Sequence, residues 1–170
     1  MSEKAARARL YSIMEELIHF HLLLDYPRND VRGPADERTW QLGWDEAQDW
    51  LRRGKHLCFD CSQSTGQIFR WAKLHDPCGV EFRFPGDTGL MLHHLATHYH
   101  DPRRARVGAL VVFGPGTGEH VAMVIEPGPD PLLFSHGQAH TAGPIRFSVE
   151  RTFHHQPATF LAVDKLLTSA

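Results

Sequence analysis

The chain has 170 residues, of which 42% are hydrophobic and 22% are charged, and its formal net charge at pH 7 is -2. These values are typical of a single globular domain, and the lack of a basic excess argues against nucleic acid or an anionic membrane as a partner. Three cysteines are too few for a disulfide scaffold, so we expect a reducing compartment.

The N-terminal part of the chain is predicted to be mostly helical. Apolar residues recur at three- and four-residue steps over residues 5–24, which indicates a helix. Residues 25–37 are rich in proline, glycine and charge and predict a loop, and residues 45–53 predict a short helix capped by Asp45. The apolar run at residues 17–24 is too short for a membrane span and lacks a cleavage site, so we expect neither a signal peptide nor a membrane anchor.

The rest of the chain changes from helical to strand-like patterns. A third helix is expected at residues 62–74, and a helical turn or short helix follows at residues 90–99. Apolar and β-branched runs, separated by Gly and Pro, then predict an antiparallel sheet of about five strands. These strands are expected within residues 106–114, 119–128, 131–137, 143–151 and 158–166.

This order of elements predicts an α+β fold in a single domain, residues 1–170. We divide it into an N-terminal helical region, residues 1–56, and a core, residues 57–170.

The spacing Cys58-x-x-Cys61 allows three interpretations. It could form a zinc site with Cys78 and a nearby histidine, and His94 and His98 could themselves chelate on one helix face. A redox pair would need a surrounding βαβ pattern, which is missing. In the third interpretation Cys61 is a nucleophile at a helix N-terminus, where free N–H groups stabilise a thiolate.

A nucleophilic thiol needs a base, and the base needs a polar group that orients it. His120 opens an alternating apolar strand directly after a glycine-rich turn, so it is the best candidate base. His136 lies near the end of the next expected strand and could be brought beside His120 to orient it. Gln138 is the alternative for that third role.

These motifs together resemble the NlpC-type cell-wall peptidases, which are papain-like cysteine enzymes. The "DCS" at residues 60–62 is similar to the family's nucleophile motif, and "VGALVVFGPGTGEHVAMVIE" at residues 107–126 is similar to its second motif, with His120 in the base position. His136 in "FSHG" matches its third position. The resemblance spans residues 59–137 and is closest to phage-encoded members.

The resemblance implies hydrolysis of peptidoglycan stem-peptide amide bonds by Cys61, His120 and His136, without a metal or organic cofactor. It also implies a lysin or virion-associated hydrolase that is made in the cytoplasm and acts on the cell wall, with phage virion proteins as further partners. The alternatives are an N-acetylmuramoyl-L-alanine amidase, as in the related CHAP enzymes, a catalytically idle member of the fold, and a zinc-binding protein.

The sequence departs from the family pattern at three places. Ala109 and Ala122 replace an acidic residue and a glycine, which leaves the subfamily and the scissile bond open. The family often has a tyrosine just before the nucleophile motif that helps to position the thiol. In this chain that region offers only His56 and Phe59.

Overall fold

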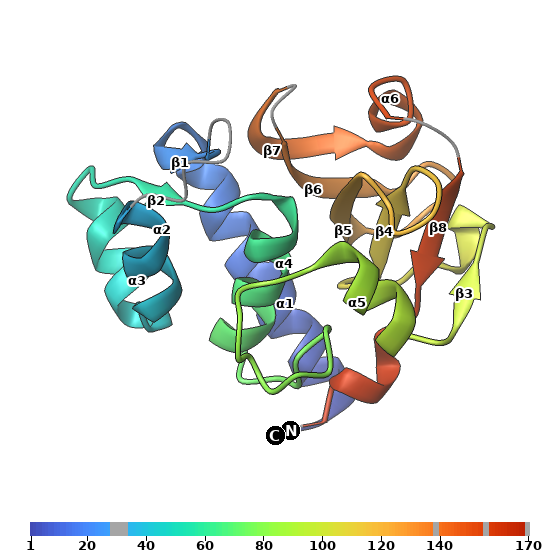
Figure 1. Ribbon diagram of the computed structural model, residues 1–170, viewed down its shortest axis with the longest axis horizontal. Coiled ribbons are helices and arrows are strands. Elements are labelled where there is room, and N and C mark those ends of the chain that lie inside the picture. Colours follow the sequence, from blue (N-terminus) through green and yellow to red (C-terminus); the bar gives the residue numbers. More distant parts are fainter. Residues whose placement is uncertain (28–33, 138–139, 155–156, 169–170) are drawn as a thin grey trace.

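The computed structural model describes residues 1–27, 34–137, 140–154 and 157–168, and it confirms the predicted α+β fold class (Figure 1). Within these ranges no helix combines the length and the apolar character needed to cross a bilayer. The α-helices are α1 (Glu3–His19), α2 (Pro34–Gln41), α3 (Trp44–Arg52), α4 (Cys61–Trp71), α5 (Thr88–His94) and α6 (Phe147–Glu150), and the 3-10 helices are η1 (His21–Leu23), η2 (Pro102–Arg104) and η3 (Asp164–Leu166).

The main sheet has six strands in the order β3-β8-β4-β5-β6-β7, and all neighbouring strands are antiparallel. The sixth strand is β3, a short edge strand in a segment that we expected to be helical. The strands are β3 (His98–Tyr99), β4 (Leu110–Phe113), β5 (His120–Glu126), β6 (Leu132–Gly137), β7 (His140–Arg146) and β8 (Ala158–Leu161).

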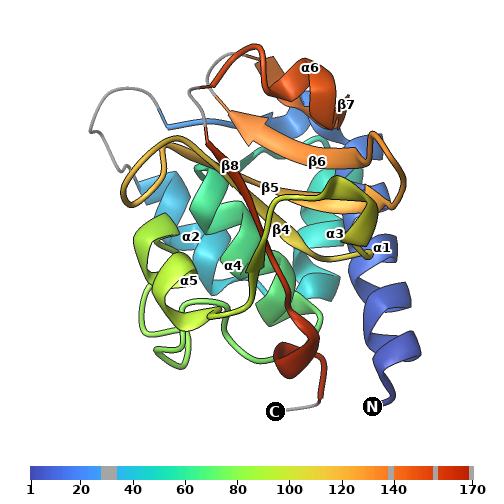
Figure 2. The same cartoon turned by 90° about the vertical axis from the view of Figure 1, so that its right-hand side faces the viewer.

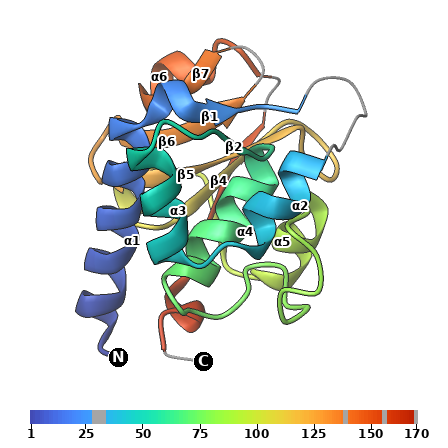
Figure 3. The ribbon, with the colours of Figure 1, turned by 90° about the vertical axis from the view of Figure 1, so that its left-hand side faces the viewer.

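The sheet separates two hydrophobic layers because side chains alternate along each strand. Val121 and Met123 of β5 pack in a layer with residues of α1 and α4, and we name this side the helical face. Ala122 and Val124 point to the outer face, which Phe147 of α6 helps to close. Figure 3 shows α1, α3 and α4 in front of the sheet, whereas Figure 2 shows the sheet from the other side, with α6 at its upper edge.

A small parallel pair of strands joins the N-terminal segment to the loop before α4. Strand β1 (Leu24–Asp25) pairs with β2 (Leu57–Cys58), with Leu24 opposite Leu57 and Asp25 opposite Cys58. The pairing continues as the Phe59 N–H donates to the Asp25 carbonyl at 3.2 Å. As a result, residues just after β1 lie beside residues just before α4, although about 30 positions separate them.

The start of α4 is fixed by a capping box rather than by the serines of its first turn. The Asp60 carboxylate accepts from the Gln63 backbone N–H at 2.8 Å, and the Gln63 side chain accepts from the Asp60 N–H at 2.9 Å. Ser62 instead donates to Asp60 Oδ1 at 2.9 Å. Both ends of the box satisfy otherwise orphaned backbone donors, so the helix begins one residue earlier than predicted, at Cys61.

Gly66 allows the chain to cross close over α4. A Cβ atom at Gly66 would lie 2.2 Å from the carbonyl oxygen of Pro85, which no side chain can tolerate. The converse holds at Gly86, where a Cβ atom would lie 2.2 Å from the carbonyl oxygen of Ser62. The segment containing Pro85 and Gly86 therefore packs directly on the backbone of the first two turns of α4.

Two local predictions are wrong because of proline and glycine positions. Helix α2 begins at Pro34, inside the predicted loop, because the first turn of a helix tolerates proline. Helix α3 is capped by Gly43 and not by Asp45, and the Glu46 side chain accepts from the Gly43 N–H at 3.3 Å.

The third correction concerns the fourth predicted strand, whose second half forms α6. Asp130, in the turn before β6, accepts from the Ser148 N–H at 2.8 Å and from its hydroxyl at 2.7 Å. This long-range contact satisfies a donor in the first turn of α6 and so favours a helix over an extended chain. It cannot be read from the local pattern.

Candidate active site

Cys61 is buried at the first position of α4, below the start of β5. It is only 7% exposed. Its sulfur accepts hydrogen bonds from the Val121 and Ser62 N–H groups and from the Tyr26 hydroxyl. Three segments that are distant in the sequence therefore converge on one thiol, at a helix end whose dipole favours negative charge.

Tyr26 is the functional candidate that sequence reasoning missed. It follows β1, and the parallel pairing of β1 with β2 brings it to the helix N-terminus. Its hydroxyl donates to the Cys61 sulfur and accepts from the Cys61 backbone N–H. The family pattern places a tyrosine immediately before the Asp-Cys-Ser motif, whereas the fold provides one from 35 positions upstream. Only the long-range strand pairing carries that signal.

The thiol of Cys61 is protonated at neutral pH. Burial and, to a smaller extent, the neighbouring Asp60 carboxylate raise its pKa to about 11, although the three hydrogen bonds act in the opposite direction. Burial thus outweighs the stabilisation that the helix N-terminus gives a thiolate. A reaction at Cys61 must therefore remove the proton as the bond to the substrate forms.

His136 lies on the helical face of the sheet, on the same side as Cys61. It is 2% exposed, and its ring centroid is 5.3 Å from that of Tyr26 and 5.0 Å from that of Phe59. Its Nε2 lies 2.7 Å from the Phe59 carbonyl and 3.0 Å from the Asp25 carbonyl. Since carbonyls only accept, Nε2 carries the hydrogen and Nδ1 keeps its lone pair.

The free lone pair of His136 has no partner in the structure. Nδ1 is buried and makes no hydrogen bond. Burial also lowers the pKa of His136 below its ordinary value of 6.5, so the ring is neutral at pH 7. A neutral imidazole with an unused lone pair, on the same face of the sheet as a protonated thiol, has the protonation state that a general base requires.

His120 lies on the outer face of the sheet, so the structure does not bring it to Cys61. Its ring is 6.0 Å from that of Phe113, which belongs to the outer layer. The physical reason is strand alternation: Val121 packs towards α4, and its neighbour His120 must point the other way. The expected arrangement, with His120 and His136 side by side at the thiol, is therefore not found. Their catalytic roles stay predictions.

On the outer face, His120 contacts two buried polar residues. Its Nε2 is 2.8 Å from Ser135 Oγ and 2.9 Å from Glu150 Oε1. These residue types are those of a serine-hydrolase triad, but in a triad the serine and the carboxylate contact different ring nitrogens. Here both contact the same nitrogen, and Ser135 is fully buried. The cluster is not arranged for nucleophilic attack.

The zinc interpretation of the cysteines is not supported by their positions. Among the described residues, His, Cys, Asp or Glu ligand atoms gather three together within 4.8 Å in a single group, and that group contains no cysteine. The Cys78 thiol donates to the Asp87 carbonyl at 3.6 Å. His94 ends α5 and His98 lies in β3, so they do not share a helix face. Gln138 lies outside the described residues.

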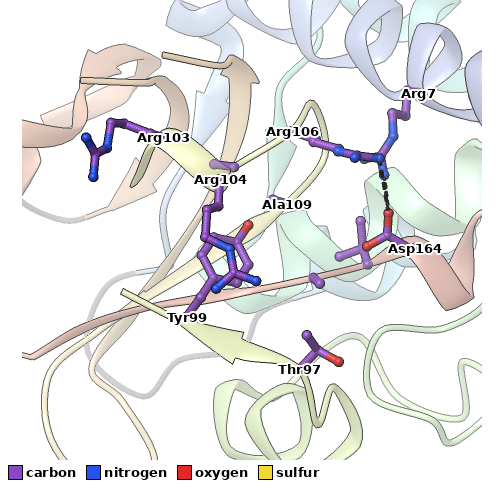
Figure 4. Close-up of a pocket in the computed structure, with 11 residues that line it drawn as sticks. Arg7, Thr97, Tyr99, Arg103, Arg104, Arg106, Ala109 and Asp164 are labelled. Atoms are coloured by element: carbon purple, nitrogen blue, oxygen red, sulfur yellow. Dashed lines mark hydrogen bonds and ion pairs between the residues drawn. The ribbon is translucent and has the colours of Figure 1, made fainter. Parts of the chain in front are cut away.

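A separate cavity of about 480 Å³ is lined by four arginines, but none of its lining residues contacts the thiol (Figure 4). Figure 4 shows Arg7 directed at Asp164, and the two groups are 2.7 Å apart. Arg103 pairs with Asp101 at 2.9 Å, and Arg104 stacks over a tyrosine ring. Much of the positive charge of this cavity is thus neutralised locally.

Neither a comparison with protein-family models nor a comparison with curated proteins finds a match to this chain. The argument for a function therefore depends on the geometry around Cys61 and on the resemblance of the short motifs.

Proposed function

We propose that this protein is a cysteine hydrolase that cleaves amide bonds in the stem peptides of peptidoglycan, with Cys61 as its nucleophile. The observation that carries the proposal is the convergence of three hydrogen-bond donors on a thiol at a helix N-terminus. The choice of peptidoglycan as the substrate depends on the motif resemblance over residues 59–137.

The donors around Cys61 suit the charge that develops during acyl transfer. When the sulfur attacks a carbonyl carbon, the carbonyl oxygen becomes an oxyanion that needs two donors close by. The Cys61 backbone N–H and the Tyr26 hydroxyl are already within hydrogen-bonding distance of one another. A substrate oxygen that enters between them could accept from both, and the first turn of α4 adds its favourable dipole.

We assign the general base to His136 instead of His120. His136 shares the helical face with Cys61, is neutral, and has an unpartnered Nδ1. Its Nε2 is held by the Phe59 and Asp25 carbonyls, which fix the tautomer as a carboxylate or amide does in other thiol hydrolases. No third side chain is then required to orient it.

The reaction follows from these assignments. His136 takes the thiol proton as Cys61 sulfur attacks the amide carbonyl, and the tetrahedral intermediate collapses to a thioester while His136 protonates the leaving amine. Water then attacks the thioester, with His136 taking a proton from that water. The products are a free carboxylate, a free amine and regenerated Cys61.

The test is digestion of purified peptidoglycan, followed by mass spectrometry of the released fragments. Wild-type protein is expected to release fragments that identify the bond, either within the stem peptide or at its junction with the sugar. Cys61→Ala should release none, since the nucleophile is gone. Cys58→Ser and Cys78→Ser are the matched thiol controls, and both should keep most of the activity.

The two histidines separate the base assignments. His136→Ala should lower the rate at least about 100-fold, the usual contribution of a general base. If His120→Ala abolishes activity while His136→Ala keeps it, the base predicted from the sequence is correct and our assignment is not. If Cys61→Ala releases the same fragments as the wild type, the proposed function itself is wrong.

A further inference from the structure

The outer face of the sheet carries a buried cluster that the thiol chemistry does not use. Its members are His120 at the start of β5, Glu150 at the end of α6, and His154 four residues later. Their ligand atoms all lie within 4.8 Å of one another. Figure 1 shows α6 on the opposite side of the sheet from α1 and α4.

The distances in this cluster suit a metal ion. Glu150 Oε1 is 2.9 Å from His120 Nε2 and 3.4 Å from His154 Nε2. Ligand atoms at about 2.0–2.2 Å from a tetrahedral zinc ion lie roughly 3.3–3.5 Å from one another, so these two pairs would need to shift by no more than about half an ångström. The two imidazoles stack with centroids 4.3 Å apart and planes 7° apart, so a ring would have to rotate for both lone pairs to point at the same ion.

The same cluster contains a buried nitrogen without a hydrogen-bond partner. His154 Nε2 is buried, faces Glu150, and makes no hydrogen bond. Glu150 is itself fully buried and lies close to both histidines. A cation between the three groups would give the His154 nitrogen a partner and would carry a charge opposite to that of the carboxylate.

We propose that His120, Glu150 and His154 bind a divalent transition-metal ion of the zinc class. Two imidazoles and one carboxylate select zinc, cobalt, nickel or copper over magnesium and calcium, which prefer oxygen ligands. Ser135 supports the site, because its hydroxyl donates to Glu150 Oε1 and holds the carboxylate in place.

The ion has a structural role in this position. His120 is 3% exposed and Glu150 is fully buried, so a substrate cannot reach the fourth coordination position that three protein ligands leave on a tetrahedral ion. By joining β5 to the segment around α6, the ion closes the outer layer. The ion also fixes the position of His120, the residue before Val121. The Val121 N–H in turn contacts the Cys61 sulfur on the other side of the sheet. The proposal does not depend on Cys61 being catalytic.

The test uses the full-length protein after removal of metals with a chelator. Addition of ZnCl₂ is expected to raise the melting temperature, and elemental analysis after dialysis should find one zinc per chain, whereas MgCl₂ should have no effect. His154→Ala should weaken zinc binding by more than the roughly 10–100-fold that loss of an outer-shell partner costs. His93→Ala, which removes an exposed histidine outside the cluster, is the matched control and should bind like the wild type.

Cobalt(II) provides a second readout that needs no stability measurement. Bound by nitrogen and oxygen ligands, it should give visible d–d absorption without the near-ultraviolet charge-transfer band of a cobalt–thiolate bond. That thiolate band, removed by Cys58→Ser or Cys78→Ser, would assign the metal to the cysteines and overturn the proposal. The proposal also fails if zinc neither binds nor stabilises the wild type, or if His154→Ala binds it as tightly.

Discussion

At the scale of single residues, the environment of Cys61 shows why a helix N-terminus does not by itself create a reactive thiolate. The donors of Ser62, Val121 and Tyr26 favour the ionised sulfur, but removing the group from water disfavours it by more. The site therefore works, in our proposal, by stabilising charge only as it forms on the substrate. Enzymes gain rate from interactions of that kind, which are stronger in the transition state than in the ground state.

Tyr26 provides a direct test of this idea. Tyr26→Phe removes one proposed oxyanion donor and keeps the ring that contacts His136. We expect kcat for peptidoglycan hydrolysis to fall about 100-fold with little change in KM, because the lost interaction belongs to the transition state.

Tyr26→Phe should also change the reactivity of the Cys61 thiol. The Tyr26 hydroxyl lowers the pKa of Cys61, so its loss should slow alkylation of Cys61 by iodoacetamide at a fixed alkaline pH. Tyr11→Phe removes a hydroxyl from an exposed tyrosine on α1 and should change neither quantity. Equal values of kcat for peptidoglycan hydrolysis in Tyr26→Phe and the wild type would exclude the oxyanion role of Tyr26.

At the scale of elements, the sequence predicts the longer helices α1, α3 and α4 and the strands β4, β5, β6 and β8, but not the contacts between distant segments. The pattern of "HVAMVIE" predicts β5 correctly. Successive side chains of a strand point to opposite faces of the sheet, and both faces of this strand are buried. The same alternation also predicts that His120 and Val121 point to opposite faces of the sheet. What the pattern cannot give is which side α4 covers, since both faces of this strand are buried.

The sequence does not predict Tyr26 or α6, and the cause is the same in both cases. Tyr26 reaches the thiol through the pairing of β1 with β2, and α6 forms where Asp130 caps it. Both depend on residues far away in the sequence, where local propensity has no information.

Gly66 offers a test of packing at the element scale. In an exposed helix, replacing glycine by alanine stabilises by about 1 kcal/mol, because alanine loses less conformational entropy. In α4 the new methyl group would overlap the Pro85 carbonyl oxygen, so we expect the opposite sign. Gly66→Ala should lower the free energy of unfolding by about 1–3 kcal/mol, as overpacked sites do, measured by urea titration.

The control for this prediction is Gly43→Ala, where a Cβ atom would meet nothing within 4 Å. That change should shift the free energy of unfolding by less than about 1 kcal/mol. If Gly66→Ala were as stable as the wild type, the segment containing Pro85 would have to move away from α4 at little cost. The close crossing of the two segments would then not be a constraint on α4.

At the scale of the whole molecule, the sheet separates two polar clusters, and both β5 and β6 carry neighbouring residues that belong to opposite clusters. Cys61, Tyr26 and His136 lie on the helical face, and His120 and Glu150 lie on the outer face. Because β5 contributes to both, whatever fixes its first residues on one face limits their freedom on the other. The proposed metal site would in this way support the thiol site without taking part in its chemistry.

The buried thiols also make the stability of the whole fold depend on alkaline pH. Burial raises the pKa of Cys61 to about 11 and that of Cys78 to about 12, from an ordinary value of 9.0. Between these values the unfolded chain has released both thiol protons while the folded chain still holds them. A raised pKa stabilises the fold at neutral pH, and that stability is lost as pH rises from 9.

We therefore expect the free energy of unfolding to fall between pH 8 and pH 10, by about 1 kcal/mol from Cys61 with a further contribution from Cys78. The measurement is urea unfolding of the reduced protein at both pH values. The double variant Cys61→Ala/Cys78→Ala has lower stability at pH 8 because it loses packing, but its change between the two pH values should be smaller than that of the wild type. Cys58→Ser removes a half-buried thiol and should leave the wild-type pH dependence in place. An equal fall in the double variant and the wild type would mean that other groups, and not these thiols, set the alkaline limit of the fold.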